Sequence, residues 1–222
     1  MRTIQSDGAV LCLPDRADGA LYTVCCIAGE DFAGELAGIW ETLPPVAVIL
    51  VPPGKWEALS PFPAPALREG EPDFTPGAAA VLDRAAAAYD RLKRDYPLQP
   101  GPAIAGYSLA GLTALYGLHG GWGGKFSAFA SLSGSLWMEG WDAFAESHPV
   151  PPEARAYLSL GGKEEKAGNP RMRRVGEATR AEVGRLKMQL SPRSLHFTLH
   201  PGGHFKDIPG RWRAALCWLA EK

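Results

Sequence analysis

The sequence predicts an α/β fold in which one domain, residues 1–222, is built on a mostly parallel sheet with helices on both faces. Three observations support this prediction. Short apolar runs recur at wide intervals, most segments between them are compatible with helices, and the runs are apolar throughout rather than alternating. Strands buried on both faces require such continuous apolarity. At 222 residues the chain is long enough for one such domain with its own core.

Strands are expected where short runs are rich in β-branched residues or are bounded by turn residues. In chain order these runs cover residues 9–13, 21–27, 46–51, 102–107, 126–132, 156–160 and 196–200. Because a helix that follows one strand returns the chain to start the next in the same direction, the sheet is expected to be mainly parallel.

Helices are expected between most of these strands, at residues 32–42, 76–95, 109–119, 170–190 and 209–221. Pro76 and Pro170 stand where a first helical turn accepts proline, and Pro97 follows the end of the second helix. The fourth helix carries an apolar stripe opposite a basic face, which we interpret as solvated. The Pro-rich loop at residues 52–72 has a length typical of functional or mobile loops.

Composition and charge exclude several classes of protein. Hydrophobic residues make up 46% and charged residues 21%, as in ordinary globular proteins, and the net charge of −1 gives no attraction to nucleic acid or an anionic membrane. No run is long enough to span a bilayer and the first residues lack an apolar signal core, so a cytoplasmic location is expected. The cysteines show no metal-ligand spacing, and we expect small buried thiols without a metal or other cofactor: Cys12, Cys25, Cys26 and Cys217.

The most informative stretch is residues 103–111, AIAGYSLAG, in which a short apolar run leads to Ser108 and a helix-compatible run follows. Strand, sharp turn and helix in this order are typical of a nucleophile elbow, whose strained apex serine tolerates little bulk two residues to either side. Gly106 satisfies this requirement. Ala110 is one methyl group larger than the usual glycine, and we expect this methyl to be harmless.

A nucleophilic serine needs a base to accept its proton. Among the five histidines, His204 lies in the glycine-softened loop PGGHF between the last predicted strand and the last helix, and it is the candidate base. The other four are expected to lie at the surface or to be satisfied within the last strand: His119 and His148 in the first group, His196 and His200 in the second.

The base in turn needs an acid to orient it. The loop at residues 161–165, GGKEE, follows a predicted strand and offers Glu164 and Glu165 at suitable spacing. We favour Glu164 and retain Glu165 as the alternative, with Asp207, three residues after His204, as a weaker rival. The chain order nucleophile, acid, histidine is that of α/β-hydrolases.

Attack on an ester also needs hydrogen-bond donors for the developing oxyanion. One expected donor is the N–H of Leu109, and the second is the N–H of Gly29 or Glu30, in the loop after the strand at 21–27. Ser133 and Ser135 are expected to be structural or to line the pocket. The candidate pocket residues are aromatic: Trp56, Phe62, Tyr107, Trp137 and Trp141.

Together these residues resemble the esterase family of α/β-hydrolases that includes enterochelin and related siderophore esterases, esterase D (S-formylglutathione hydrolase) and mycolyltransferases. The siderophore-esterase-like members look most similar. The resemblance covers most of the chain from about residue 22. It rests on GYSLAG (106–111), SLSGSLW (131–137), GGKEE (161–165) with Asn169, Met172 and Thr179, GGHF (202–205) with Arg211, and the loop at 56–65.

The resemblance implies a serine carboxylic ester hydrolase with a Ser108, Glu164 and His204 triad that forms an acyl-enzyme with a small-molecule ester. One departure is Ala28 before Gly29, where the family often has aspartate. Two alternatives stay open: an acyltransferase on the same fold, and a non-catalytic binding protein that keeps the fold. The ester, its acyl length and the oligomeric state are also left open.

Overall fold

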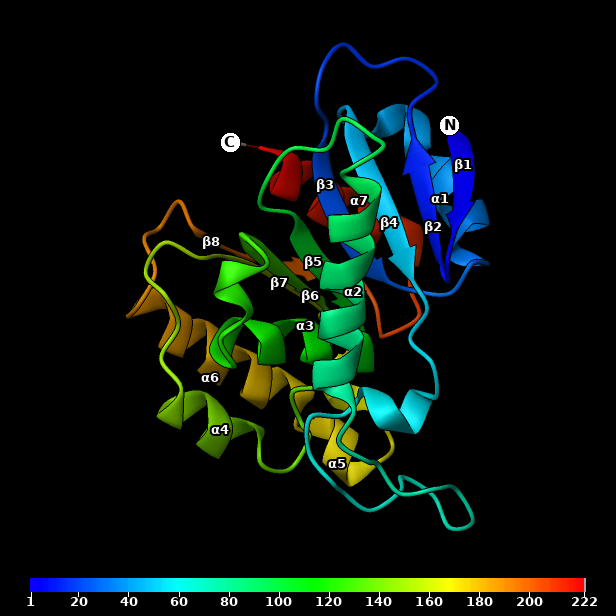
Figure 1. Cartoon of the computed structure of the whole chain (residues 1–222). Helices are drawn as coiled ribbons and strands as arrows, with labels where there is room; N and C mark the ends of the chain where they lie inside the picture. The colour runs from blue at the N-terminus through cyan, green and yellow to red at the C-terminus, as the bar shows by residue number, and fades with distance from the viewer. Residues whose placement is uncertain (222) are drawn as a thin grey trace.

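The computed structural model describes residues 1–221, and its strands form one eight-stranded sheet in the order β1-β2-β4-β3-β5-β6-β7-β8 (Figure 1). β3 to β8 run parallel to one another, while β2 lies antiparallel to both β1 and β4. The predicted α/β fold with a mostly parallel sheet is therefore confirmed. The strands are β1 (Arg2–Ser6), β2 (Ala9–Leu13), β3 (Tyr22–Ile27), β4 (Val46–Val51), β5 (Ala103–Tyr107), β6 (Ala128–Leu132), β7 (Arg155–Gly161) and β8 (Leu195–His200).

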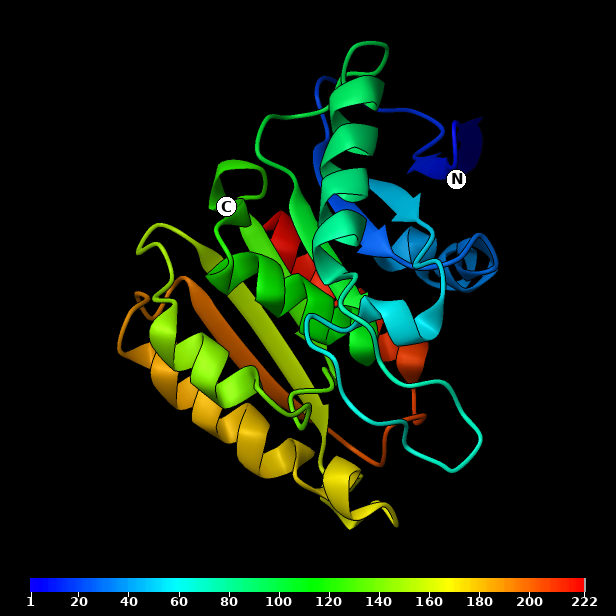
Figure 2. The same ribbon diagram turned by 60° about the horizontal axis from the view of Figure 1, so that its bottom comes forward.

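Helices cover both faces of the sheet, and each face has its own apolar core (Figure 2). α1 (Phe32–Ile39) and α7 (Ile208–Ala220) pack together on one face, where the rings of Phe32 and Trp212 lie 4.7 Å apart. The other face carries α2 (Ala78–Leu92), α3 (Leu109–His119), α4 (Trp141–Ser147), α5 (Pro170–Arg173) and α6 (Val175–Lys187). Short 3-10 turns cover Trp40–Thr42, Trp56–Leu59, Trp122–Gly124 and Glu164–Lys166.

The structure adds two elements that the sequence did not predict and divides a third. β1 was missed because its residues are mostly exposed at the sheet edge, so it lacks an apolar run. α4 is only seven residues long and begins after Gly140, which has a φ of 90°. The predicted helix at 170–190 is two helices, α5 and α6, that meet at Arg174.

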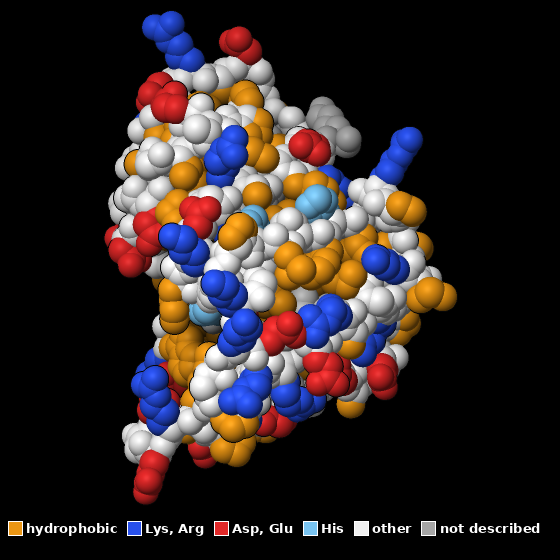
Figure 3. Space-filling view, turned by 180° about the vertical axis from the view of Figure 1, so that it is seen from behind, with side chains coloured by type: hydrophobic (Ala, Val, Ile, Leu, Met, Phe, Trp, Pro, Cys, Tyr) orange, Lys and Arg blue, Asp and Glu red, His pale blue; other side chains and the backbone are white. Residues whose placement is uncertain are grey.

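The cysteines are free thiols, and charges of both signs share one face of the surface. Seen from behind (Figure 3), basic and acidic side chains are interspersed rather than gathered by sign. No helix within residues 1–221 is long and apolar enough to cross a membrane. Cys12, Cys25 and Cys26 are buried free thiols and Cys217 is partly buried, and burial raises the pKa of Cys12 to about 11.

Candidate active site

Ser108 stands at the apex of a sharp turn between β5 and α3. Its φ of 59° and ψ of −121° are unusual for a residue with a side chain and cost about 1–3 kcal/mol. A Cβ added at Gly106 would lie 2.2 Å from the carbonyl oxygen of Ala110, which explains the glycine. Ala110 itself is accommodated and buried. The Ser108 hydroxyl does not cap α3, so it remains available to another partner.

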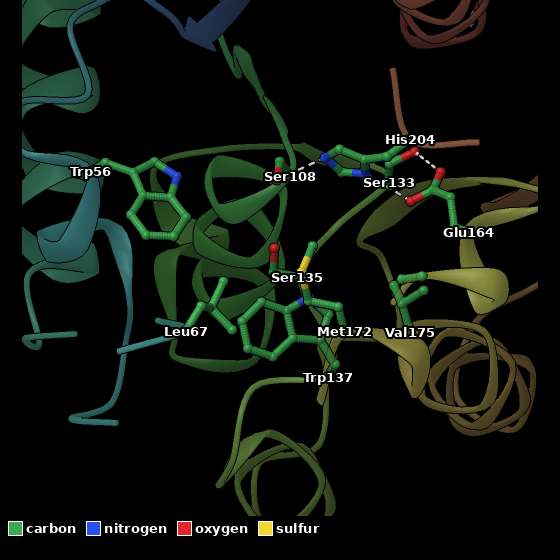
Figure 4. A pocket seen from close by; sticks show the side chains of 11 residues that line it. Trp56, Leu67, Ser108, Ser133, Ser135, Trp137, Glu164, Met172, Val175 and His204 are labelled. Atoms are coloured by element: carbon green, nitrogen blue, oxygen red, sulfur yellow. Dashed lines mark hydrogen bonds and ion pairs between the residues drawn. The ribbon is translucent and has the colours of Figure 1, made fainter. Parts of the chain in front are cut away.

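The structure brings Ser108, His204 and Glu164 into one hydrogen-bonded chain (Figure 4). The Nε2 atom of His204 lies 3.0 Å from Ser108 Oγ, and its Nδ1 atom lies 2.7 Å from Glu164 Oε2. A carboxylate can only accept, so Nδ1 carries the proton and Nε2 faces the hydroxyl as an acceptor. This arrangement lets the ring take the serine proton.

Glu164 is held by more than the histidine. Its Oε1 atom accepts hydrogen bonds from Ser133 Oγ at 2.7 Å, the N–H of Gly161 at 2.6 Å and Arg211 Nη1 at 2.9 Å. Burial alone would raise the pKa of Glu164, but hydrogen bonds from His204, Ser133 and Gly161 outweigh it and lower the pKa to about 2. The carboxylate is therefore ionised across the working range of an enzyme.

The rival acids have other partners. Glu165 points to the neighbouring helix, where Arg180 binds its Oε2 at 2.6 Å in a solvent-exposed pair. Asp207 has a left-handed φ of 53° and its Oδ1 accepts from the N–H of Gly210, so it caps α7. Neither carboxylate hydrogen-bonds to His204.

The other histidines lie outside the hydrogen-bonded chain of Ser108, and two expectations about them were wrong. His119 was expected at the surface but is buried, because Glu182 Oε1 lies 2.8 Å from its Nε2 and the carbonyl of His148 lies 2.6 Å from its Nδ1. His148 is exposed as expected. On β8, His196 stacks on Tyr157 at 5.3 Å. His200 was expected to be satisfied, but its buried Nε2 has no hydrogen-bond partner within residues 1–221, and burial lowers its pKa.

The expected oxyanion donors lie beside the elbow. Ile27, the last residue of β3, pairs with Gly106 of β5, so the loop at 28–31 leaves the sheet next to Ser108. Within residues 1–221 the N–H groups of Gly29 and Glu30 have no acceptor. Leu109 begins α3, so its N–H has no acceptor within the helix. The placement agrees with the prediction, which stays a prediction because no ligand marks the oxyanion position.

A small cavity of about 60 Å³ opens at Ser108 and His204 (Figure 4). Away from the polar end its walls are apolar side chains from three separate segments. Trp56 and Trp137, both expected, line it. The sequence did not identify the remaining apolar lining residues, although Met172 belongs to the resemblance: Leu67, Ala167, Met172 and Val175.

Three aromatic residues expected in the pocket lie elsewhere. Trp141 is fully buried beside His119, because it fills the core under α4. Phe62 packs edge-on against Phe144 and is not among the residues that line the cavity. Tyr107 lies beneath the His204 loop, where its hydroxyl donates to the carbonyl of His204. Ser133 and Ser135 both line the cavity, and neither hydrogen-bonds to a histidine.

No protein-family model and no curated protein matches the sequence. Solved structures do match. An IroE-like serine hydrolase from Shewanella oneidensis superimposes with a TM-score of 0.73 at 17% identity, over 95% of this chain and 72% of that chain. The siderophore hydrolase EstB from Aspergillus nidulans superimposes with a TM-score of 0.73 at 17% identity, over 96% of this chain and 89% of the EstB chain. The enterobactin esterase FES from Shigella flexneri superimposes with a TM-score of 0.64 at 19% identity. The match covers 95% of this chain but only 54% of the FES chain, about half its length.

These likenesses agree with the strand order. A parallel sheet with a serine elbow after β5, an acid after β7 and a histidine after β8 places all three side chains at the carboxyl ends of the strands. The chain therefore has the α/β-hydrolase fold, which these solved structures share.

Proposed function

We propose that this protein is a serine carboxylic ester hydrolase that works through an acyl-enzyme. The observation that carries the proposal is the hydrogen-bonded chain Ser108–His204–Glu164 beneath an open cavity. A serine held in strained geometry, with its hydroxyl on a neutral imidazole nitrogen, is poised for nucleophilic attack. Two structural neighbours, an IroE-like serine hydrolase and the siderophore hydrolase EstB, support the same reaction class.

In this mechanism Ser108 Oγ attacks the ester carbonyl while His204 Nε2 accepts its proton. The carbonyl oxygen becomes an oxyanion, which the N–H of Leu109 and that of Gly29 or Glu30 stabilise, at about 3 kcal/mol for each donor. The C–O bond to the leaving alcohol then breaks, and His204 returns the proton to that alcohol. Water repeats the sequence on the acyl-enzyme, releasing the acid and free Ser108. Glu164 keeps the imidazole oriented throughout.

The cavity walls favour an uncharged acyl group of small size. Beyond Ser108, Ser133, Ser135, Glu164 and His204, the lining is apolar. An isolated charge placed there would lose its hydration without gaining a partner. A small-molecule ester with a short apolar acyl chain therefore suits the site, and Trp56, which lines the cavity and is 47% exposed, would contact a larger leaving group.

Turnover of p-nitrophenyl acetate tests the proposal. We expect Ser108→Ala and His204→Ala each to lose about 10³-fold or more in kcat. His148→Ala, which removes an exposed histidine outside the site, should retain the wild-type rate. Turnover unaffected by Ser108→Ala would overturn the assignment.

Product analysis with an added alcohol separates the two catalytic alternatives. Free acid alone, even at high alcohol concentration, indicates hydrolysis. A predominant new ester would instead make the protein an acyltransferase.

A further inference from the structure

One guanidinium group lies fully buried behind the three site residues. Arg211 of α7 is 0% exposed and reaches the ends of several different segments. Its Nη1 donates to Tyr107 Oη at 3.0 Å, to Glu164 Oε1 at 2.9 Å and to Ser133 Oγ, while Nη2 donates to the carbonyl of Gly203 at 2.7 Å. A single side chain thus joins the ends of β5 and β6, the acid loop and the histidine loop.

These contacts fix which oxygen of Glu164 faces the histidine. Arg211, Ser133 and the N–H of Gly161 all donate to Oε1, so Oε2 is the oxygen that accepts from His204. The side chains of Arg211 and Glu164 pack tightly against Gly161, since a Cβ added at Gly161 would lie 2.6 Å from Arg211 Nη2 and 2.8 Å from Glu164 Oε1. The carboxylate therefore has one orientation.

The same guanidinium fixes the loop that carries the base. It binds the carbonyl of Gly203, directly before His204, and the Tyr107 hydroxyl that it touches donates to the carbonyl of His204. The planar guanidinium of Arg211 on α7 thus holds both the acid Glu164 and the loop that carries the base His204. A small shift of either would lengthen the hydrogen bonds on which proton transfer depends.

Arg211 also sets the charge around the imidazole. The other titratable groups that interact with the Arg211 charge are Tyr107, Tyr157 and His200, and the charge of Asp207 at the start of α7 also acts on His200. Burial raises the pKa of both tyrosines and lowers that of His200, so all three are neutral at working pH. Glu164 and Arg211 then form a buried pair of zero net charge, and the guanidinium opposes the attraction between the carboxylate and a protonated His204.

We propose that Arg211 is a positioning residue that holds Glu164 and His204 in register and moderates the field of the carboxylate on the imidazole. The inference rests on the proposed esterase function. It assigns to Arg211 a double effect, on the rate through geometry and on the pH dependence through charge. A residue that only filled the core would affect neither the pH dependence nor kcat in the folded protein.

Steady-state kinetics of p-nitrophenyl acetate as a function of pH separate the two effects. Arg211→Lys keeps the charge but loses the planar guanidinium, so kcat should fall about 10- to 100-fold while KM stays unchanged. The acid limb, the fall of kcat/KM at low pH, should also stay where it is in the wild type. Arg211→Met loses both, so kcat should fall about 100-fold or more and the acid limb should move up by about half a pH unit or more. Ser133→Ala removes a neutral donor and should lower kcat without moving the acid limb.

The matched control is Arg213→Met on the same helix, because Arg213 is exposed and donates to Thr42. It should leave kcat and the acid limb unchanged. Wild-type kcat in Arg211→Lys, or an unmoved acid limb in a folded Arg211→Met, would overturn the proposal. If Arg211→Met does not fold, the Arg211→Lys and Ser133→Ala results decide. Absence of turnover in the wild type itself would refute the esterase assignment, not this inference.

Discussion

Replacing Glu164 with glutamine should turn an NH2 group toward His204, because the hydrogen bonds around Glu164 fix the orientation of the side chain. Oε1 accepts from Ser133, Gly161 and Arg211, and all three are donors. The amide oxygen of the glutamine must take this place, because an NH2 group there would face three donors. The NH2 group is then turned toward His204.

An NH2 group only donates, so it reverses the hydrogen bond at His204 Nδ1. The imidazole must then carry its proton on Nε2, 3.0 Å from Ser108 Oγ, where it can no longer accept the serine proton. A base held in the wrong tautomer loses about 10⁴-fold in kcat. We expect a loss of about 10³- to 10⁴-fold in kcat for p-nitrophenyl acetate, with KM little changed.

Glu165→Gln is the matched control, since the Glu165 side chain is 42% exposed and pairs with Arg180 rather than with His204. It should retain kcat within about twofold. A thermal melt must accompany the assay, because the glutamine leaves buried Arg211 without its counter-charge, at a cost of about 3 kcal/mol. A folded Glu164→Gln that keeps a tenth of the wild-type kcat, or a Glu165→Gln that loses as much kcat as Glu164→Gln, would contradict the tautomer that we assign to His204.

Three further predictions concern the close packing at Gly106, the ionisation of Glu164 and the contacts of Arg171. Gly106→Ala puts a Cβ 2.2 Å from a carbonyl oxygen and should cost more than about 3 kcal/mol in urea unfolding. Gly184→Ala, in open space, should cost nothing, and equal losses would contradict this account. The pKa of Glu164 lies near 2, below its ordinary 4.5, so its stabilising contribution is complete above pH 4.5 and is lost as the pH falls toward 2. Acid unfolding should show that component in the wild type but not in Glu164→Gln. Arg171 lies over the lining residue Trp137 and binds the carbonyls of residues 65–66, next to the lining residue Leu67. Arg171→Ala should therefore loosen this wall and raise KM about threefold or more at constant kcat; a fall in kcat alone would argue against this role.

The sequence nominated Ser108 and His204, which the structure places within hydrogen-bond distance, because each lies in a local glycine pattern with a clear backbone reason. It could not separate Glu164 from Glu165 on spacing alone. The structure separates them through a 3-10 turn at 164–166 that buries one carboxylate and exposes the next. The direction of that turn depends on long-range contacts with Arg211 on α7, which local patterns do not carry.

The same limit explains the errors. An aromatic residue near a predicted site lines a pocket or fills a core according to which helix covers it, and Trp141 lies in the unpredicted α4. His119 looked exposed at the end of a helix, but its partner Glu182 comes from α6, far along the chain. The strands were predicted well because a sheet buried on both faces leaves an apolar signature in each central strand.

A fluorophosphonate probe tests whether Ser108 is the nucleophile, because the probe reacts with a serine whose hydroxyl is activated by a neighbouring base. We expect stoichiometric labelling of the wild type, a mass increase confined to the peptide that contains Ser108, and no labelling of Ser108→Ala. Equal labelling of the two proteins, or a label on Ser133 or Ser135, would contradict this assignment.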